Sequence, residues 1–340
     1  MRPVDNPPSR LTGAALEWEE LPPAAELVIR EEQAASLLTC NDSPDIGFRW
    51  SINPYRGCQH ACSYCYARRT HEYFELGAGT DFDTHIFVKV NAPELLAAEL
   101  RRPGWRREPI AIAGVTDAYQ PLEATYRLTR RCLEVCCDAV QPVGIVTKGY
   151  LVVRDIDVLL ELQRRSRVHV EFSITFADDD AARSVEPHAP PPSRRFEALR
   201  QLRDAGVPAG VLIAPVIPGL NDRAIPAILK RAAECGAQTA GLAPVRLPGS
   251  VADVFLRRLR QTSPDAAARV EQRIRDLRGG RLNDPRFGHR FEAHGAYWES
   301  VQRLFDTFAR RLGLSGEPPW RCEDPPRPTI RQLPLFPGLG

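Results

Sequence analysis

Three cysteines lie close together in the segment NPYRGCQHACSYCY, which runs from residue 53 to residue 66. Cys58, Cys62 and Cys65 form a C-x3-C-x2-C array. Three thiols on so short a segment can reach one metal centre, and thiolate sulfur is the ligand type that iron–sulfur clusters and zinc select. We therefore favour a metal site over three buried cysteines or an oxidised pair with a spare thiol.

The ligand count favours an iron–sulfur cluster over zinc. A structural zinc ion usually has four protein ligands, and no second CxxC or H-x3-H partner follows at zinc-ribbon spacing. A non-enzymatic zinc-binding module, completed by a distant residue, stays open as an alternative. A [4Fe-4S] cluster held by three cysteines keeps one iron free for a further ligand, and a cofactor can bind there.

The elements that must position these cysteines alternate between short β-rich and amphipathic helical segments. The β-rich segments are residues 48–55, 110–117, 143–148, 168–176, 209–217 and 239–247. The helical segments between them are residues 128–139, 155–165, 193–205 and 224–235. Such alternation predicts parallel strands joined by right-handed crossovers. Six units of this kind fit an α/β fold, a partial (β/α)6 barrel of the TIM type.

The remaining segments suggest four parts of the chain. These are an N-terminal extension (1–47), the partial barrel (48–250), a C-terminal helical module (251–313) and a proline-rich tail (314–340). Within the barrel, a strand at 85–90 and a helix from Pro93 form an insertion. The helical module should contain helices at 251–260, 264–277 and 297–312.

Bulk properties limit the class of protein. A chain of 340 residues can form one large barrel domain or two average domains. Nine cysteines without a signal-peptide pattern predict a reducing, cytoplasmic location. No apolar run approaches the roughly 20 residues of a membrane span, so we expect no membrane partner. Basic residues outnumber acidic ones between 246 and 313, and such an excess can contact phosphate.

Reactive side chains of parallel barrels gather at the C-terminal ends of the strands. This rule selects Thr116 and Asp117 after the second strand and Lys148 after the third. The fourth strand alternates apolar residues with a polar set that should line the interior, namely His169, Glu171, Ser173 and Thr175. We take the last two as functional candidates, and the first two as structural residues that a mutual or a backbone hydrogen bond would satisfy.

Each of these candidates also has a structural interpretation. Asp117 could cap the following turn, Lys148 could be a solvated loop residue, and the two strand hydroxyls could bond to backbone. A further set of thiols, Cys132, Cys136 and Cys137, lies on one predicted helix. Buried helix thiols usually act as small apolar side chains, so we favour that role over an auxiliary cluster.

The cysteine array, with Tyr64 before its last cysteine, resembles the radical S-adenosylmethionine superfamily. The string CSYCY is similar to the spore photoproduct lyase-like branch of that superfamily. This resemblance implies two cofactors, a [4Fe-4S] cluster and S-adenosyl-L-methionine (SAM) bound to its fourth iron. One electron from a flavodoxin- or ferredoxin-type donor would cleave SAM to methionine and a 5'-deoxyadenosyl radical, which takes hydrogen from the substrate.

The resemblance also implies roles for individual residues. Matched position by position, the cofactor-binding residues are Tyr64, Thr116, Asp117, Lys148, Ser173 and Thr175. In this branch, a cysteine before the second-strand acid returns hydrogen to the product radical, assisted by a tyrosine beside the cluster. Residues 113–116 offer no thiol, so that relay is not expected, and Tyr66 is the expected catalytic residue. Residues 186–190, followed by Arg194 and Arg195, also resemble a loop of this branch, without a definite role.

These features predict a radical SAM enzyme that acts on nucleic acid, in a lyase-like reaction or DNA repair, with DNA as its partner. A radical SAM enzyme that modifies a peptide, a protein or a small metabolite is the alternative. The tail adds a second signal, the pentapeptide that contains Gln332, Leu333, Leu335 and Phe336. It resembles the Q-L-x-L-F motif with which bacterial DNA polymerases and repair proteins bind the sliding clamp, although a tail folded back onto an apolar groove is an alternative.

The clamp motif generates a direct prediction. The double substitution Leu335→Ala with Phe336→Ala should abolish retention by the sliding clamp, because it removes both apolar anchors. SAM cleavage should persist, since the tail is separate from the cysteine array. A pulldown with the clamp measures the first effect, and equal retention of both proteins would exclude this partner.

Overall fold

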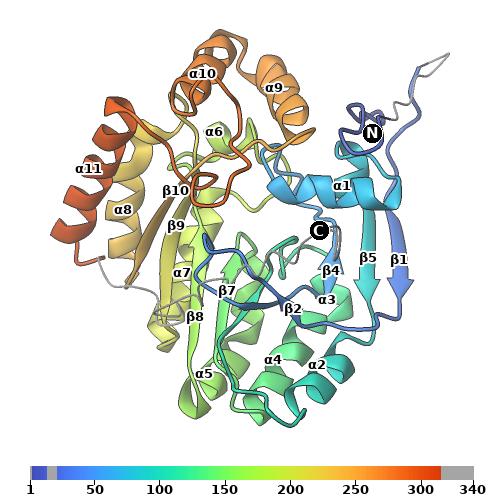
Figure 1. Ribbon diagram of the computed structural model, residues 1–340. Coiled ribbons are helices and arrows are strands. Elements are labelled where there is room, and N and C mark those ends of the chain that lie inside the picture. Colours follow the sequence, from blue (N-terminus) through green and yellow to red (C-terminus); the bar gives the residue numbers. More distant parts are fainter. Residues whose placement is uncertain (1, 14–20, 315–340) are drawn as a thin grey trace, which may run out of the picture.

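The main sheet of the protein is an open, partial barrel. The computed structural model describes residues 2–13 and 21–314, and its main sheet has the strand order β10-β9-β8-β7-β6-β3-β2 (Figure 1). Six strands are parallel neighbours: β3 (Trp50–Ile52), β6 (Ile110–Ile112), β7 (Val143–Thr147), β8 (Val168–Ser173), β9 (Ala209–Val216) and β10 (Ala240–Pro244). β2 (Thr39–Cys40) adds an antiparallel edge strand. Within the described residues β2 and β10 do not pair with each other, so the barrel stays open.

Helices cover the outer face of this sheet (Figure 1). The crossovers contain α4 (Leu128–Asp138), α5 (Ile156–Arg165), α7 (Pro192–Ala205) and α8 (Ile225–Glu234). Shorter elements are α3 (Glu123–Tyr126), α6 (Asp179–Arg183), η2 (Tyr150–Asp155) and η3 (Asp222–Ala224). The predicted α/β fold, with six strands in sequential order and helices between them, is confirmed.

β8 separates the apolar core from the barrel interior. Its side chains alternate between the core, which takes Val168, Val170 and Phe172, and the interior, which takes His169, Glu171 and Ser173. Because all six are buried, the polar ones need partners inside the protein. His169 Nε2 lies 3.1 Å from Glu171 Oε1, and both bond to the Thr239 hydroxyl. The structural role predicted for His169 and Glu171 is confirmed.

A small second sheet lies beside the barrel. It has the order β1-β5-β4, formed by β1 (Val28–Glu32), β5 (His85–Lys89) and β4 (Tyr55–Arg56). η1 (Tyr66–Phe74) and α1 (Thr80–Thr84) adjoin it, and α2 (Ala92–Leu100) follows β5 and packs against α4. The inserted strand and helix are confirmed. β1 was not predicted, because its first four residues are all exposed and leave no alternating pattern.

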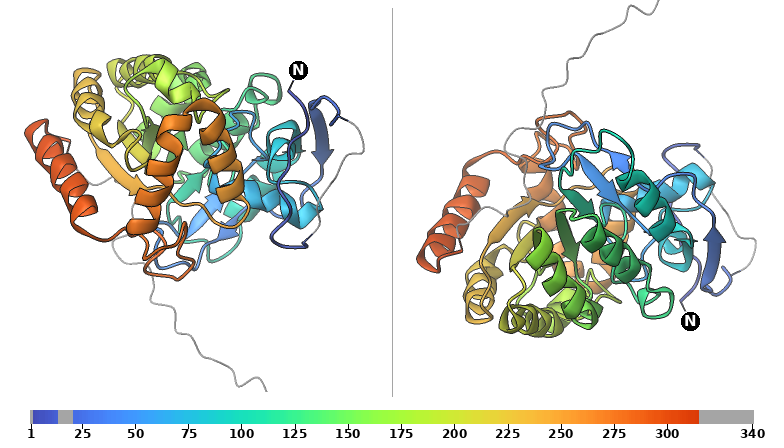
Figure 2. Two further views of the ribbon diagram at one scale, coloured as in Figure 1. Left: turned by 90° about the horizontal axis from the view of Figure 1, so that it is seen from above. Right: turned by 90° about the horizontal axis from the view of Figure 1, so that it is seen from below.

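The C-terminal helices pack in two different places. α9 (Val251–Thr262) and α10 (Pro264–Asp276) share an apolar cluster with Cys62 and Tyr64, and they lie over the upper end of the barrel (Figures 1 and 2). α11 (Ala296–Arg311) instead packs against α8 (Figure 2). Among the described helices, none is long and apolar enough to cross a membrane. The four motif residues Gln332, Leu333, Leu335 and Phe336 lie outside the described residues.

Candidate active site

The cysteine loop follows β4 and is shaped by the glycine before its first cysteine. Gly57 has a φ of +82°, and a Cβ atom there would lie 2.9 Å from the backbone oxygens of Phe82 and His85. Glycine adopts this conformation without steric cost and leaves room for the close backbone approach. The Cys58 N–H donates to the Phe82 carbonyl at 3.1 Å, so the loop starts firmly against α1 and β5.

Thr116 bonds the end of β6 to this loop. Its hydroxyl donates to the Gly57 carbonyl at 2.6 Å and accepts from Gln120 Nε2 at 3.1 Å. Asn53 holds the same segment, because its Oδ1 accepts from the Gly114 N–H at 2.8 Å. Thr116 therefore lies beside the cysteines, and its hydroxyl proton is already used in a bond to the protein.

Asp117 ties two strand ends to the cysteine loop. Its Oδ1 accepts from the Thr147 hydroxyl at 2.6 Å and from the Tyr119 N–H at 2.9 Å, and its Oδ2 accepts from the Lys148 N–H at 2.8 Å. His60 Nδ1 lies 3.3 Å from Oδ2. Burial alone would raise the pKa of Asp117, but His60 and these donors outweigh it and hold the pKa well below its usual range. The carboxylate thus acts as a structural acceptor for β6, β7 and the loop.

Lys148 and Ser173 meet where β7 and β8 end. Lys148 Nζ donates to Ser173 Oγ at 2.9 Å and lies 5.7 Å from the centre of the Tyr64 ring. Ser173 Oγ donates in turn to the Ala214 carbonyl at 3.0 Å. Within the described residues no carboxylate lies within 4.0 Å of this ammonium group. The Ser173 hydroxyl proton is thus used in a bond to the protein, and Lys148, held by Ser173, offers a cation to an anionic group beside an aromatic ring.

A buried ion pair completes this wall of the site. Glu186 and Arg195 are 1% and 0% exposed, and Arg195 Nη2 donates to Glu186 Oε2. The hydroxyls of Tyr64 and Thr175 both donate to Glu186 Oε1, the latter at 2.8 Å. Arg195 Nη1 also donates to the Ser173 carbonyl at 3.0 Å. Glu186 thereby joins the cysteine loop, the end of β8 and α7.

The charge of Glu186 is stabilised by its neighbours. Burial by itself would raise the pKa of this carboxyl, but Arg195 and Lys148 outweigh the desolvation and lower the pKa to about 2. The sequence carried one signal for this pair, namely the resemblance of residues 186–190 and of the arginines that follow. It assigned them no role, because burial of both partners depends on how α7 packs.

The three cysteines are arranged in a way that is compatible with a polynuclear cluster. Cys58 and Cys62 are buried, Cys65 is half-buried, and all three are free thiols. Two cysteines bound to one zinc ion would hold their sulfurs about 3.8 Å apart, given Zn–S bonds of about 2.3 Å. In the described part of the chain, the sulfurs of these three cysteines do not all lie within 4.8 Å of one another. Ligands of a four-iron cluster each bind a different iron and are spread in that way.

The surroundings of these thiols favour their neutral form when no metal is bound. Burial raises the pKa of Cys62 to about 12 and raises the pKa values of Cys58 and Cys65 as well. A metal centre that binds the thiolates must therefore displace their protons.

Tyr66, Arg246 and Phe291 form a group next to the cysteine loop, which we call the mouth of the site. Tyr66 is 49% exposed, and its hydroxyl donates to the Gly114 carbonyl. The Arg246 guanidinium lies 6.0 Å from the Tyr66 ring centre and 4.2 Å from that of Phe291. Burial and the nearby Arg290 lower the pKa of Arg246 to about 10, so it stays protonated at neutral pH.

Arg246 is a functional candidate that sequence analysis missed. Its buried Nε has no hydrogen-bond partner, and within the described residues it forms no ion pair. Arg246 is half-buried and has no direct counter-ion among the described residues, so an anionic ligand could pair with its guanidinium. The predicted sixth strand, residues 239–247, contained Arg246, whereas β10 ends at Pro244, so the strand-end rule could have selected Arg246 only with the shorter strand.

The thiols on α4 lie apart from the site. Cys132, Cys136 and Cys137 are buried in the apolar core between the helices and the outer face of the sheet. Their interpretation as small apolar side chains is confirmed.

Comparison with known proteins matches this architecture. A family model described as the Radical SAM superfamily matches residues 52–232. An uncharacterised protein of Mycobacterium bovis is 37% identical over 230 residues, which cover 67% of this chain and 68% of that protein. An uncharacterised protein of Methanocaldococcus jannaschii is 32% identical over 176 residues, which cover 52% of this chain and 63% of that protein.

Solved structures share the fold. Spore photoproduct lyase complexed with dinucleoside spore photoproduct superimposes with a TM-score of 0.63 at 16% identity, covering 84% of this chain and 79% of that chain. A variant of the same enzyme with bound AdoMet and dinucleoside spore photoproduct gives a TM-score of 0.62 at 17% identity. The superposition again covers 84% of this chain and 79% of that chain. At this level of identity the likeness concerns the fold.

The buried pair predicts that substitutions of two arginines of α7 change the free energy of unfolding by very different amounts. Arg195→Met should reduce the free energy of unfolding by about 3–5 kcal/mol, because it leaves the Glu186 charge buried and unpaired. Arg200→Met should cause no measurable loss, since Arg200 pairs with Glu197 at the exposed surface. Urea unfolding of the metal-free protein, followed by circular dichroism, measures both. Equal losses would contradict the role of the buried pair.

Proposed function

Because the chain belongs to the radical SAM superfamily and is a radical SAM enzyme with a [4Fe-4S] cluster and SAM as cofactors, we propose that it carries out a radical reaction on nucleic acid. The observation that carries this substrate class is Arg246, an unpaired cation beside two aromatic rings at the mouth of the site. A guanidinium fork fits phosphate oxygens, and Tyr66 and Phe291 offer faces on which bases can stack. The neighbour of known structure also binds a dinucleoside.

We assign the cluster to Cys58, Cys62 and Cys65. Their position on one loop, as free thiols within the part of the chain that the family model matches, supports this assignment. When bound, the reduced cluster supplies the electron that splits SAM into methionine and a 5'-deoxyadenosyl radical, which takes a hydrogen atom from the substrate. A donor of the flavodoxin or ferredoxin type would be the redox partner of the protein.

The protein's part is to hold SAM and to keep water away. Lys148, positioned by Ser173, presents a cation for the cofactor carboxylate, and Tyr64 presents a ring for the adenine. The contacts are stabilised by a second set of residues whose side chains hydrogen-bond to the protein, namely Thr116, Asp117 and Thr175. The apolar cluster that α9 and α10 form around Cys62 and Tyr64 excludes water from this side.

Tyr66 is our candidate catalytic residue. Its ring stands at the mouth between the cysteine loop and Arg246, where an incoming nucleotide would contact it. Cys132, Cys136 and Cys137 are enclosed on the outer side of the sheet, so a thiol from α4 does not reach the substrate. The eight described cysteines form no disulfide, and this supports a cytoplasmic setting for the enzyme.

Hydrogen transfer from a labelled substrate tests this function. The reduced enzyme, incubated anaerobically with SAM and deuterated DNA, either intact or ultraviolet-irradiated, should release 5'-deoxyadenosine that contains deuterium. Mass spectrometry measures the label. Cys58→Ala should cleave no SAM, because the cluster loses a ligand, whereas Cys235→Ala, a half-buried thiol outside the array, should behave as the natural protein.

The outcome separates the candidate substrates. Unlabelled 5'-deoxyadenosine with every DNA, together with labelled product from a deuterated peptide or metabolite, would overturn the nucleic-acid assignment. A colourless protein with zinc in the array would overturn the assignment of the cluster to these cysteines.

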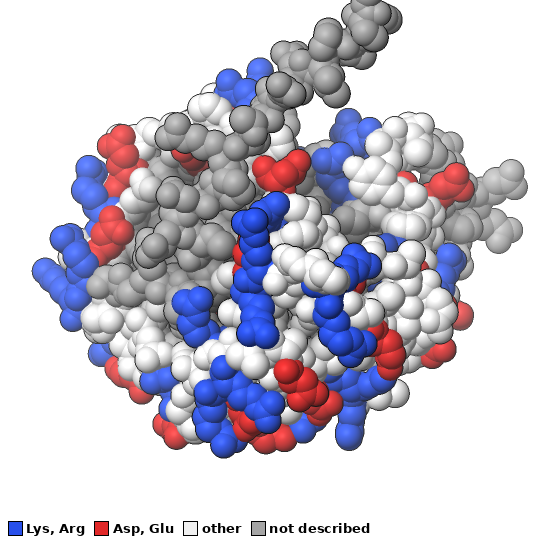
Figure 3. Space-filling model, turned by 60° about the horizontal axis from the view of Figure 1, so that its bottom comes forward, with Lys and Arg blue, Asp and Glu red and all other residues white. Residues whose placement is uncertain are grey.

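Basic side chains also occur away from the mouth. Figure 3 shows Lys and Arg side chains over the lower face of the molecule, with acidic side chains between them. The α2–β6 connection carries four exposed arginines, Arg101, Arg102, Arg106 and Arg107. This connection precedes β6, so it lies at the N-terminal ends of the barrel strands, whereas Asp117 and Lys148 follow the C-terminal ends. These arginines provide a matched control for a basic residue at the mouth.

Arg246→Gln should weaken oligonucleotide binding and lower the salt dependence of the binding constant, because one phosphate contact is lost. The slope of log K against log salt concentration should fall by about 0.7–0.9 for one contact. Arg106→Gln should leave affinity and slope unchanged. Fluorescence anisotropy at several salt concentrations measures both quantities. If only Arg106→Gln changes them, the nucleic acid binds the opposite end of the barrel and not the mouth.

A further inference from the structure

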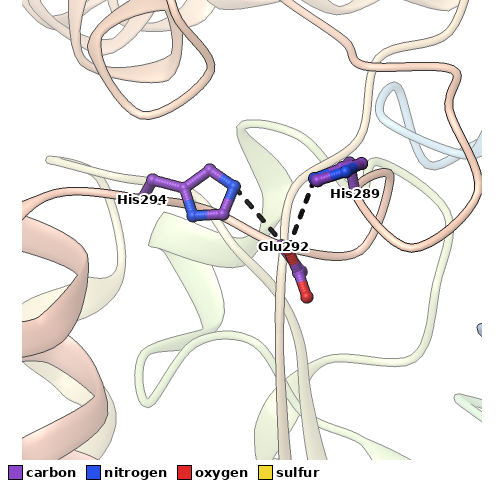
Figure 4. Close-up of side chains that lie close together, drawn as sticks. All are labelled: His289, Glu292 and His294. Atoms are coloured by element: carbon purple, nitrogen blue, oxygen red, sulfur yellow. Dashed lines mark ion pairs between the residues drawn. The ribbon is translucent and has the colours of Figure 1, made fainter.

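A second group of potential metal ligands lies in the segment between α10 and α11. It consists of His289, Glu292 and His294, whose side chains converge at the surface (Figure 4). Glu292 Oε2 lies 3.6 Å from His289 Nδ1 and 3.6 Å from His294 Nε2. Among the described residues, these are the only three histidine, cysteine or acidic side chains whose ligand atoms all lie within 4.8 Å of one another.

The spacing of these atoms is that of a ligand shell. A hydrogen bond would bring nitrogen and oxygen to about 2.7–3.2 Å, so the side chains face one another without bonding directly. A tetrahedral shell with bonds of about 2.1 Å separates neighbouring ligand atoms by about 3.4 Å, close to the observed distances. Two of the three separations are therefore close to those of such a shell, and the two histidine nitrogens lie within 4.8 Å of each other.

We propose that His289, Glu292 and His294 bind a divalent transition-metal ion of the zinc type. Two neutral imidazoles and one carboxylate suit zinc and its neighbours in the first transition row, whereas magnesium and calcium prefer oxygen ligands. All three residues are exposed, so water can fill the remaining position. This site is separate from the cysteine array and goes beyond the proposed function.

The backbone that carries the ligands is already held in place. Asp45, from the N-terminal part of the chain, accepts from the Gly288 N–H and from Arg290 Nε, both at 2.6 Å. The His294 N–H donates to the Leu277 carbonyl at 3.1 Å. Binding therefore has to order side chains only, and this lowers its entropic cost.

The metal would also stabilise one side of the active-site mouth. Phe291 lies between two of the ligands in the sequence and packs against Arg246. The neighbouring Arg290 is paired with Asp45. A cation that links His289, Glu292 and His294 holds this turn closed and so restrains Phe291 beside the mouth.

Zinc titration of the cluster-loaded protein tests the proposal. The cysteine array is then occupied, and competition with a chromophoric zinc chelator should reveal one further zinc per chain. Glu292→Gln and His294→Ala should each weaken this binding by about tenfold or more. Glu299→Gln, which alters an exposed carboxylate on α11 without histidine neighbours, should leave it unchanged.

A second measurement keeps the test independent of catalysis. Zinc should slow tryptic cleavage after Arg286 and Arg290 in the natural protein but not in His294→Ala, while both proteins unfold at the same temperature without zinc. Absence of zinc binding by the cluster-loaded protein, or unchanged binding in both ligand variants, would overturn the proposal. Neither result bears on the nucleic-acid assignment, because DNA takes no part in the experiment.

Discussion

The buried charge of Glu186 is the constraint on which the active-site geometry depends. A carboxylate withdrawn from water is stable only when a cation and hydrogen-bond donors surround it. Arg195 supplies the cation, and Tyr64 and Thr175 supply hydroxyl donors. The cysteine loop, the end of β8 and α7 are therefore joined at one carboxylate. Displacement of the loop would break these bonds and leave the charge unpaired.

Asp117 holds the cysteine loop in a similar way. It follows β6, accepts hydrogen bonds from the end of β7 and pairs with His60 of the loop. Both carboxylates form their direct bonds with other groups of the protein, so Lys148 acts on Glu186 only through space, where it helps to lower the pKa of Glu186. Lys148 and Arg246 remain without carboxylate partners within the described residues. The site thus presents positive charge at its inner wall and at its mouth, and this suits a cofactor with a carboxylate and a substrate with phosphates.

Segments from both ends of the chain enclose the barrel opening. α9 and α10 pack on Cys62 and Tyr64, so the C-terminal helices form part of the cysteine environment. Asp45, from the N-terminal part, binds the turn that carries Arg290 and Phe291. Burial of the cluster environment therefore depends on contacts between parts of the chain that are far apart in the sequence.

Local features of this protein were determined by its sequence. Hydrophobic periodicity acts over a few residues, so the strands and helices between residues 110 and 235 could be predicted, as could the polar interior face of β8. The strand-end rule likewise selected Asp117, Lys148 and Ser173. Only the tertiary structure revealed the Glu186–Arg195 pair, the unpaired Arg246 and the exposed strand β1. Burial and charge pairing depend on which distant segments cover a residue, and no local pattern encodes that.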